Sequence, residues 1–266
     1  MQKGIKFRIY PNREQKNFIH QTLGCCRLIY NRGLAMRKEN CEEGKKIGYT
    51  QTSAMLTELK RQEEFAFLKA ADSIALQQSL RDLDRSFVNF FQKRASYPTF
   101  KSKHNRFQSY RTVNQKDNIR IVGRYIKLPK LGFVKIRQSM EVGKINHVTV
   151  EYTPAGKYFA VLNVDFEPEP RPNAGGTIGI DVGIKAFYSD SNGNTVSNPR
   201  YLERSMRKLI REQRRLSRKQ KDSHNRGKQR LRVARVHEKT ANQRNDFLQK
   251  QSTMLVRETK PSVSRN

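Results

Sequence analysis

The stretch Thr177–Asp190, TIGIDVGIKAFYSD, places one carboxylate at the end of a short apolar strand. Asp181 follows the apolar run 177–180, and Val182-Gly183 then allows the backbone to turn closely around a ligand. An aspartate in this position is suited to hold a divalent metal ion. Phosphodiester cleavage by two metal ions requires at least one more carboxylate, so the predicted function depends on where a second acid lies.

The chain is strongly basic. Its 266 residues include 54 Lys and Arg against 24 Asp and Glu, which gives a formal net charge of +30 and a pI near 10.4. Such a field complements a polyanion, so nucleic acid is the predicted partner. A solvated basic protein, such as a ribosomal one, and a ligand of anionic membranes are the alternatives that charge alone leaves open.

Targeting and redox signals are few. The sequence holds no apolar run of the roughly 18 residues that a membrane-spanning helix needs, and residues 1–5 lack the apolar stretch of a signal peptide. We therefore expect a cytoplasmic protein that does not act at a membrane. Cys25, Cys26 and Cys41 have no metal-ligand spacing and are expected to be reduced and structural, and without a Cys-x-x-Cys pair no zinc site is expected.

Hydrophobic periodicity predicts an α+β protein. Alternation over residues 4–10 and again over 97–164 indicates strands of a small antiparallel β-barrel, formed by 1–10 and 97–166. Residues 11–96 have helical periodicity and are predicted as an inserted bundle of three helices. A proline-rich linker at 167–175 is predicted to separate this part from 176–266.

The last part contains two further helical patterns, which predict a helical hairpin over 199–258. A coiled-coil-like seam is predicted from Leu202, Met206, Leu209, Gln213 and Leu216 on one helix, and from Leu231, Ala234, Glu238, Ala241, Asn245 and Leu248 on the other. Its outer faces are dense in cations with few acids, and the arginines expected to contact nucleic acid are Arg207, Arg211, Arg214, Arg218, Arg232 and Arg235. We expect them to lie along the phosphates of a duplex or heteroduplex; a solvated helix face is the alternative.

A second basic stretch, residues 97–111, interleaves aromatic and cationic side chains. Its members expected to contact nucleic acid are Phe100, Lys101, Lys103, Tyr110 and Arg111. Aromatic faces stack on unpaired bases while Lys and Arg follow the phosphates. For Phe100 and Tyr110, anchoring of the loop to the barrel is an equally good interpretation.

Five segments in order resemble one family. They are YPTFKSK at 97–103, IKLPKLGFVKIR at 126–137, TPAGKYFAVL at 153–162, GIDVGIKAF at 179–187 and the stretch 230–258, and together they are similar to the TnpB family of transposon-encoded RNA-guided DNA endonucleases. The resemblance covers residues 1 to about 260. It implies a wedge-type β-barrel with an inserted recognition bundle, followed by an RNase-H-like (RuvC) nuclease domain interrupted by the basic hairpin.

The resemblance also implies partners and site residues. Guide RNA and target DNA are the expected partners, and Mg²⁺ is the family's cofactor. Asp181 matches the first catalytic, metal-binding carboxylate of the RuvC domain. Tyr49, Ser53 and Gln77 match positions near the short DNA motif beside the target, with ordinary helix surface as the alternative.

The sequence departs from the family after the segment LVRE at 255–258. The family continues into a strand with a catalytic glutamate, a four-cysteine zinc module and a final aspartate, whereas residues 259–266 of this chain offer none of these. Other acids that might replace them are Asp190, Glu203, Glu212 and Glu258, which are expected in a turn, in helical ion pairs or next to the tail. We therefore expect a RuvC domain that is truncated and does not cleave DNA alone.

Three other functions remain open from the sequence. A nuclease-dead protein under RNA guidance would repress transcription by occupying DNA. A general structural RNA-binding protein would bind without a guide. A kinase of the actin-like type would use Gly-Ile-Asp-Val-Gly as a phosphate loop, although no second such loop follows.

Overall fold

The computed structural model describes residues 1–105, 107–137, 142–167 and 177–258. The chain divides into two compact units, 1–167 and 168–266. The predicted linker 167–175 lies outside the described residues except for Glu167, and so does the tail 259–266.

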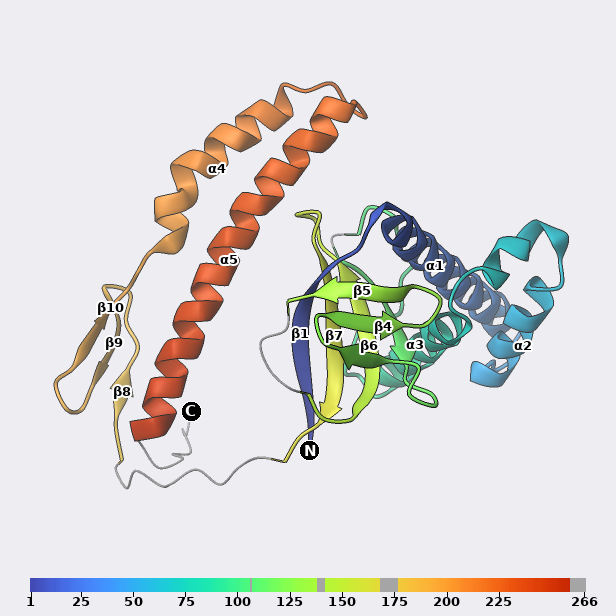
Figure 1. Cartoon of the computed structure of the whole chain (residues 1–266), viewed down its shortest axis with the longest axis horizontal. Coiled ribbons are helices and arrows are strands. Elements are labelled where there is room, and N and C mark those ends of the chain that lie inside the picture. The colour runs from blue at the N-terminus through green and yellow to red at the C-terminus, as the bar shows by residue number, and fades with distance from the viewer. Residues whose placement is uncertain (106, 138–141, 168–176, 259–266) are drawn as a thin grey trace. The chain divides into compact units, whose positions relative to one another are not determined.

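The first unit contains a seven-stranded sheet with the order β2-β6-β7-β1-β5-β4-β3 (Figure 1). Its strands are β1 Gln2–Tyr10, β2 Gln108–Val113, β3 Arg120–Val122, β4 Tyr125–Leu128, β5 Gly132–Ile136, β6 Ile145–Tyr152 and β7 Tyr158–Asp165. Every neighbouring pair is antiparallel, which confirms the prediction of an α+β protein with an antiparallel sheet. Strand β1 lies between β7 and β5, which confirms the prediction that the first strand joins this sheet. In the described strand order β2 and β3 are the edges, so closure into a barrel stays a prediction.

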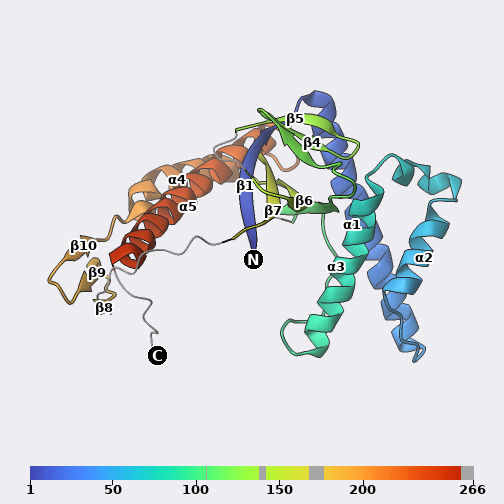
Figure 2. The same cartoon turned by 60° about the horizontal axis from the view of Figure 1, so that its bottom comes forward.

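A helical bundle lies between β1 and β2 in the chain. It comprises α1 Arg13–Glu42, α2 Tyr49–Leu59, the 3₁₀ helix η1 Glu63–Lys69 and α3 Ser73–Phe91. Figure 2 shows α1, α2 and α3 running side by side. The sequence predicted three helices in this region, in agreement with α1, α2 and α3. The helices α1 and α3 approach closely at Gly33, where a Cβ atom would lie 2.9 Å from a methyl group of Leu80 and 3.0 Å from one of Leu83. A larger residue at Gly33 would therefore force the buried side chains of Leu80 and Leu83 to shift.

The start of α1 fixes the bundle to the sheet. Asn12 Oδ1 accepts a hydrogen bond of 2.8 Å from the backbone N–H of Gln15, and Gln15 Oε1 accepts one of 3.0 Å from the backbone N–H of Asn12. This capping box satisfies two backbone donors that have no partner inside the helix. Gln15 Nε2 also donates to the Phe133 carbonyl at 2.9 Å, so the same side chain joins α1 to β5.

One hydrophobic core is shared by the sheet and the bundle. Ile126, Val134 and Leu162 from the sheet belong to the same buried cluster as Ile19 and Leu76 from the helices. Alternate residues of each strand point into this cluster, which leaves the other face of the sheet to solvent.

The second unit combines a small sheet with a long helical hairpin. Strands β8 Ile180–Asp181, β9 Ala186–Asp190 and β10 Thr195–Ser197 form an antiparallel sheet in the order β10-β9-β8. Helices α4 Tyr201–Ser217 and α5 His224–Glu258 form the hairpin (Figure 1). The sheet packs near the end of α5, where Phe187 meets Phe247 with ring centres 4.9 Å apart.

Two histidines are expected to make the stability of the first unit depend on pH. His20 Nε2 lies 2.8 Å from the Tyr158 hydroxyl. Burial raises the pKa of Tyr158 to about 12 and lowers the pKa of His20 below its usual value. The pKa of His147 is lowered mainly by burial and secondarily by the charge of Arg111.

We expect the protein to lose stability as the pH falls through about 6.5, because the unfolded histidines then bind protons that the folded ones do not. The midpoint of urea unfolding should be lower near pH 5.5 than near pH 7.5. A double variant, His20→Gln with His147→Gln, should reduce this difference. An unfolding midpoint that is the same in wild type at both pH values would contradict the assignment.

Candidate nucleic-acid interface

The seam of the α4–α5 hairpin contains a buried polar pair. The buried residues of the two hairpin helices are Leu209, Glu212, Gln229, Val236 and Thr240. Gln229 Nε2 donates to Glu212 Oε2 at 2.7 Å and to the Glu212 carbonyl at 3.0 Å, so neither polar side chain is left without a partner.

The predicted seam is wrong in part. Leu209 is buried as predicted, and five other predicted positions are half-buried: Leu202, Leu216, Leu231, Ala234 and Glu238. The other five are exposed: Met206, Gln213, Ala241, Asn245 and Leu248. The stripe on α5 instead passes through Gln229, Val236 and Thr240. A pattern based on apolar residues cannot find a seam whose buried positions include a glutamate and a glutamine that satisfy each other.

Glu212 is a structural anion. Besides Gln229, it contacts Arg215 at 3.3 Å and Arg211 at 3.8 Å. The hydrogen bond from Gln229 holds the pKa of the Glu212 carboxyl below its usual value, and the charges of the neighbouring arginines lower it further. Desolvation acts in the opposite direction but is outweighed. The prediction that this residue is ion-paired is confirmed, and its oxygens are occupied within the hairpin.

Cationic side chains line two grooves on the hairpin. The first groove, of about 670 Å³, is lined by Arg204, Ser205, Lys208, Arg211, Glu212, Arg232, Arg235, Val236 and Lys239. The second, of about 360 Å³, is lined by Arg207, Ile210, Arg211, Arg214, Arg215 and Arg218. Arg211 belongs to both. All six arginines predicted from the hairpin sequence thus line one groove or the other, and six cations face a single carboxylate in the first.

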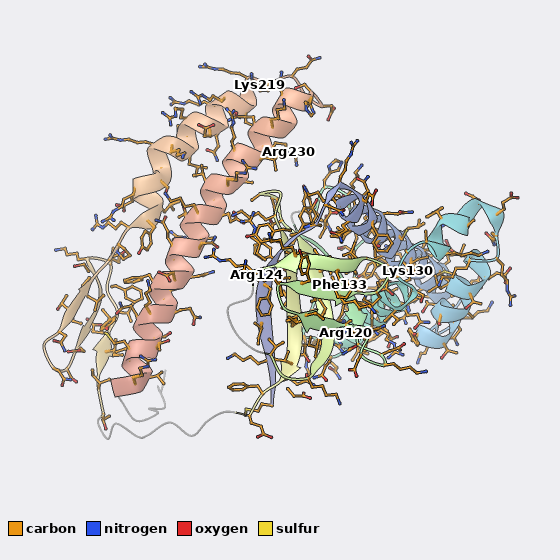
Figure 3. The ribbon with its side chains drawn as sticks, in the orientation of Figure 1. Arg120, Arg124, Lys130, Phe133, Lys219 and Arg230 are labelled. Carbon is orange, nitrogen blue, oxygen red and sulfur yellow. The ribbon has the colours of Figure 1, made fainter. Side chains whose placement is uncertain are left out.

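The cations extend along both helices to the turn of the hairpin. Figure 3 labels Lys219 and Arg230 at that end. Arg226 Nη1 donates to the carbonyls of Lys219 at 2.8 Å and Leu216 at 3.3 Å, which satisfies acceptors at the end of α4. The turn that joins the two basic helices is therefore held by one of their own arginines.

The second predicted stretch, 97–111, is exposed at its start. Phe100 is 51% exposed, and Lys38 Nζ lies 5.0 Å from the centre of its ring. The backbone of Lys101 is fixed by Asn31, which accepts from the Lys101 amide at 2.8 Å and donates to its carbonyl at 2.9 Å. Lys101 Nζ lies 4.0 Å from the centre of the Tyr30 ring, and Lys103 is exposed.

The end of this stretch is not a loop. Residues 108–113 form β2, and Tyr110 is a core residue with 6% exposure. The prediction that Tyr110 stacks on a base is wrong, because its ring is covered by the core, and the alternative interpretation as an anchor holds. Arg111 contacts Asp82 of α3 in an ion pair, so its charge is neutralised within the protein.

Tyr49, Ser53 and Gln77 lie on α2 and α3. Tyr49 and Ser53 are one turn apart on α2, and Gln77 lies one turn before Arg81 on α3. The guanidinium carbon of Arg81 is 5.0 Å from the centre of the Tyr49 ring, which joins the two helix faces. Gln77 is exposed, and Tyr49 and Ser53 are half-buried.

Asp181 is an exposed carboxylate at the end of β8, opposite Ser189 of β9. The neighbouring pair is Ile180 and Asp190, so Asp190 points to the other face of this small sheet. Asp190 instead closes its turn, with Oδ1 accepting from the amides of Asn192 at 2.9 Å and Asn194 at 2.8 Å. The hydrogen bond from the Asn194 side chain is the largest cause that lowers the pKa of Asp190, and the bonds from the two backbone amides lower it further.

The metal site that Asp181 implies is not assembled by the described residues. Glu203 lies 3.7 Å from Arg200, and Glu212 is held in the hairpin. Within residues 1–105, 107–137, 142–167 and 177–258, no group of three or more His, Cys, Asp and Glu residues is placed to hold a metal ion.

Comparison with known sequences identifies the family. A family model described as a probable transposase matches residues 147–263, and one described as a helix-turn-helix domain matches residues 1–46. A putative RNA-guided DNA endonuclease of Streptomyces pristinaespiralis is 38% identical over 267 residues, which cover 99% of this chain. The chain belongs to the TnpB family. In this TnpB-family chain residues 1–46 form β1 and the single long helix α1.

Two further similarities define the extent of the match. The putative RNA-guided DNA endonuclease InsQ of Escherichia coli K12 is 35% identical over 95% of this chain. The TnpB-family chain spans 66% of the length of the Streptomyces relative and 63% of InsQ. A solved CRISPR-Cas12f ternary complex matches with a TM-score of 0.40 and 14% identity, over 92% of this chain and 60% of the Cas12f chain.

No helix in the described part of the chain has the length and apolar character needed to cross a membrane.

Proposed function

We propose that this chain is the nucleic-acid-binding part of a TnpB-type RNA-guided DNA endonuclease. In this proposal it holds a guide RNA and a target DNA, and the domain order is a wedge-type barrel, a recognition bundle and a RuvC-like domain. The observation that carries the proposal is the pair of cation-lined grooves on the α4–α5 hairpin. Names of relatives at 38% and 35% identity agree with it.

The hairpin is proposed to follow the backbone of a duplex or heteroduplex. Arg207, Arg211, Arg214 and the C-cap residue Arg218 recur at intervals of four, three and four residues and so lie on one side of α4 and its C-terminal end. Like charges on successive turns repel each other, and phosphates placed alongside remove that cost while releasing counterions. Such contacts fix the position of a nucleic acid without reading its sequence.

Reading of a short DNA motif is proposed for the face shared by α2 and α3. Gln77 offers an exposed amide, which can hydrogen-bond a base edge in a groove. Tyr49 is held by Arg81 and lies one turn from Ser53. Phe100 and Lys103 are proposed to contact an unpaired segment from the neighbouring loop.

Asp181 is proposed to supply one ligand to a catalytic Mg²⁺. When bound, two such ions would stabilise the attacking and leaving oxygens of the phosphodiester. Such a site needs at least one further carboxylate beside Asp181, and among the described residues no group of three or more His, Cys, Asp and Glu side chains is placed to hold a metal ion. On this observation of the described residues we propose that the chain binds without cutting.

The proposal is tested with the purified chain, its co-purified RNA, a matched target duplex and Mg²⁺. We expect RNA-dependent protection of the target in a footprint, and no cleavage products. An Asp181→Ala variant should give the same footprint within about twofold, because its carboxylate makes no binding contact in this proposal. Cleavage by wild type that Asp181→Ala abolishes would contradict the proposal that the chain binds without cutting, and loss of the footprint in this variant would contradict the role of Asp181.

Binding without cleavage favours a second candidate function, which is repression of transcription under RNA guidance. The observation that favours it is that, among the described residues, no group of three or more His, Cys, Asp and Glu side chains is placed to hold a metal ion. A reporter gene carrying the target near its promoter should be repressed when chain and guide are both present. Repression that is unchanged without the guide would instead favour a general RNA-binding or DNA-binding protein.

A further inference from the structure

The outer face of one half of the large sheet is rich in exposed aromatic and cationic residues. In β1, β3, β4 and β5 alternate residues point away from the core. Eight outward side chains lie on the end of β1 and on the three other strands. They are Arg8, Tyr10, Arg120, Val122, Tyr125, Lys127, Phe133 and Lys135. Three of these eight are aromatic, four are cationic, and none is acidic. Figure 3 labels Arg120 and Phe133 on this part of the sheet.

The strand register places these side chains in two rows across the sheet. In the first row Arg120 pairs with Lys127, which pairs with Phe133. In the second row Tyr125 pairs with Lys135, which pairs with Tyr10 of β1. Directly opposite residues have Cβ atoms about 4.5–5.5 Å apart, so each aromatic ring has a lysine as its neighbour.

The rings are open to solvent. Tyr10 is 46% exposed, Tyr125 is 47% exposed and Phe133 is 50% exposed. The cation of Arg8 lies 5.2 Å from the centre of the Tyr10 ring. A solvent-facing set of rings between cations is costly to leave in water and is typical of a binding surface rather than of a core.

The remaining half of the sheet differs in charge. There Lys6 is paired with Glu151 of β6 at 2.5 Å and lies over the Phe159 ring at 4.6 Å. A cation neutralised by an acid has less to offer to a phosphate. Among the described residues, no ion pair involves the outward cations of the half formed by β3, β4, β5 and the end of β1.

We propose that this face, defined by Tyr10, Tyr125, Phe133, Lys127 and Lys135, binds a single-stranded segment of nucleic acid. The rings stack on successive unpaired bases, and the lysines between them contact the phosphates. A duplex keeps its base faces stacked inside, so it offers no surface to these rings. The proposal rests on the proposed function only in taking nucleic acid as the ligand, since the surface lies in the first unit and the hairpin grooves lie in the second.

Tryptophan fluorescence tests the stacking directly, because the chain contains no Trp. A Phe133→Trp variant carries a single reporter on the face. Its emission should be quenched on titration with a short oligouridylate or oligodeoxythymidylate, and much less with a duplex of the same length. A Phe67→Trp variant is the matched control, because Phe67 is 44% exposed but lies on η1 next to Glu63 and Glu64.

A loss-of-binding experiment completes the test. Tyr125→Thr with Phe133→Thr keeps residues that favour strands and should weaken single-strand binding by about 10-fold or more, with duplex binding changed by less than about twofold. Hairpin variants should show the reverse pattern, so failure here leaves the hairpin proposal standing. Equal quenching of both tryptophan variants, or an unchanged single-strand affinity of the threonine variant, would overturn the inference. Quenching by RNA alone would support it and add contacts to the 2′-hydroxyl.

Discussion

A variant with Arg207, Arg211, Arg214 and Arg218 all replaced by glutamine should bind a nucleic-acid duplex about 100-fold more weakly near 0.1 M salt. These four side chains line the same groove on α4. Each cation that neutralises a phosphate also releases counterions, so the slope of log affinity against log salt should fall by roughly 3 to 4. The measurement is a salt series of binding isotherms by fluorescence anisotropy, with wild type and variant side by side.

The control for this variant removes the same charge elsewhere. Lys45, Lys46, Arg61 and Lys116 are exposed residues of the first unit, and Lys45 and Arg61 are already paired with Glu43 and Glu58. Their replacement by glutamine should change duplex affinity by less than about fivefold and leave most of the salt slope. If both variants lose affinity equally, net charge rather than the groove explains binding, and the assignment of the hairpin is wrong.

The sequence predicted those elements whose information is local. The alternation Phe133-Val134-Lys135-Ile136 follows the pleat of β5, with Val134 and Ile136 buried. Asn12 and Gln15 form a capping box at the start of α1, close to where the helical pattern was predicted to begin. In these cases the backbone geometry of the element and the side that faces the core are both determined by the same few neighbouring residues, so the sequence alone is enough to predict them.

Elements whose information is distant in the sequence were missed. Strand β2 is rich in polar residues, and its burial of Tyr110 and Thr112 follows from pairing with β6 and packing against α3. Glu212 is buried in the hairpin because Gln229, 17 residues away, donates to it. A single-sequence pattern cannot show which partner satisfies a buried polar group.

The candidate site was predicted in part for the same reason. Arginines spaced along one helix can be assigned to a face from their numbers alone, and those of α4 line a common groove. The surface with Tyr10, Tyr125 and Phe133 requires the pairing of β1 with β5 and of β5 with β4. The alternation of each strand signals that these rings are exposed, but only the register brings residues 115 or more positions apart into one row, as with Tyr10 and Tyr125.

Replacing Asp84 with alanine should destabilise the first unit by about 2 to 3 kcal/mol. Asp84 of α3 contacts Arg37 of α1 in an ion pair, and the Arg37 side chain is only 6% exposed. Removing the carboxylate leaves a buried guanidinium without its anion. The expected cost lies below that of a fully buried pair because the Asp84 side chain is 38% exposed. Thermal unfolding should show a fall in Tm of roughly 4 to 12 °C.

Arg37→Met is the matched variant, since it removes the charge that needs compensation and keeps a long side chain. The guanidinium of Arg37 lies 4.8 Å from the centre of the Phe87 ring, and a methionine retains contact with that ring. Arg37→Met should cost less than Asp84→Ala, and the double variant should be no less stable than Asp84→Ala alone. Losses that simply add, or an Asp84→Ala variant with the stability of wild type, would show that the pair does not hold α1 against α3. Because α3 also carries Gln77 and Arg81, a loosened α1–α3 contact should weaken the motif-dependent DNA binding that we propose for this face, while the binding that we propose for the hairpin of the second unit should be unchanged.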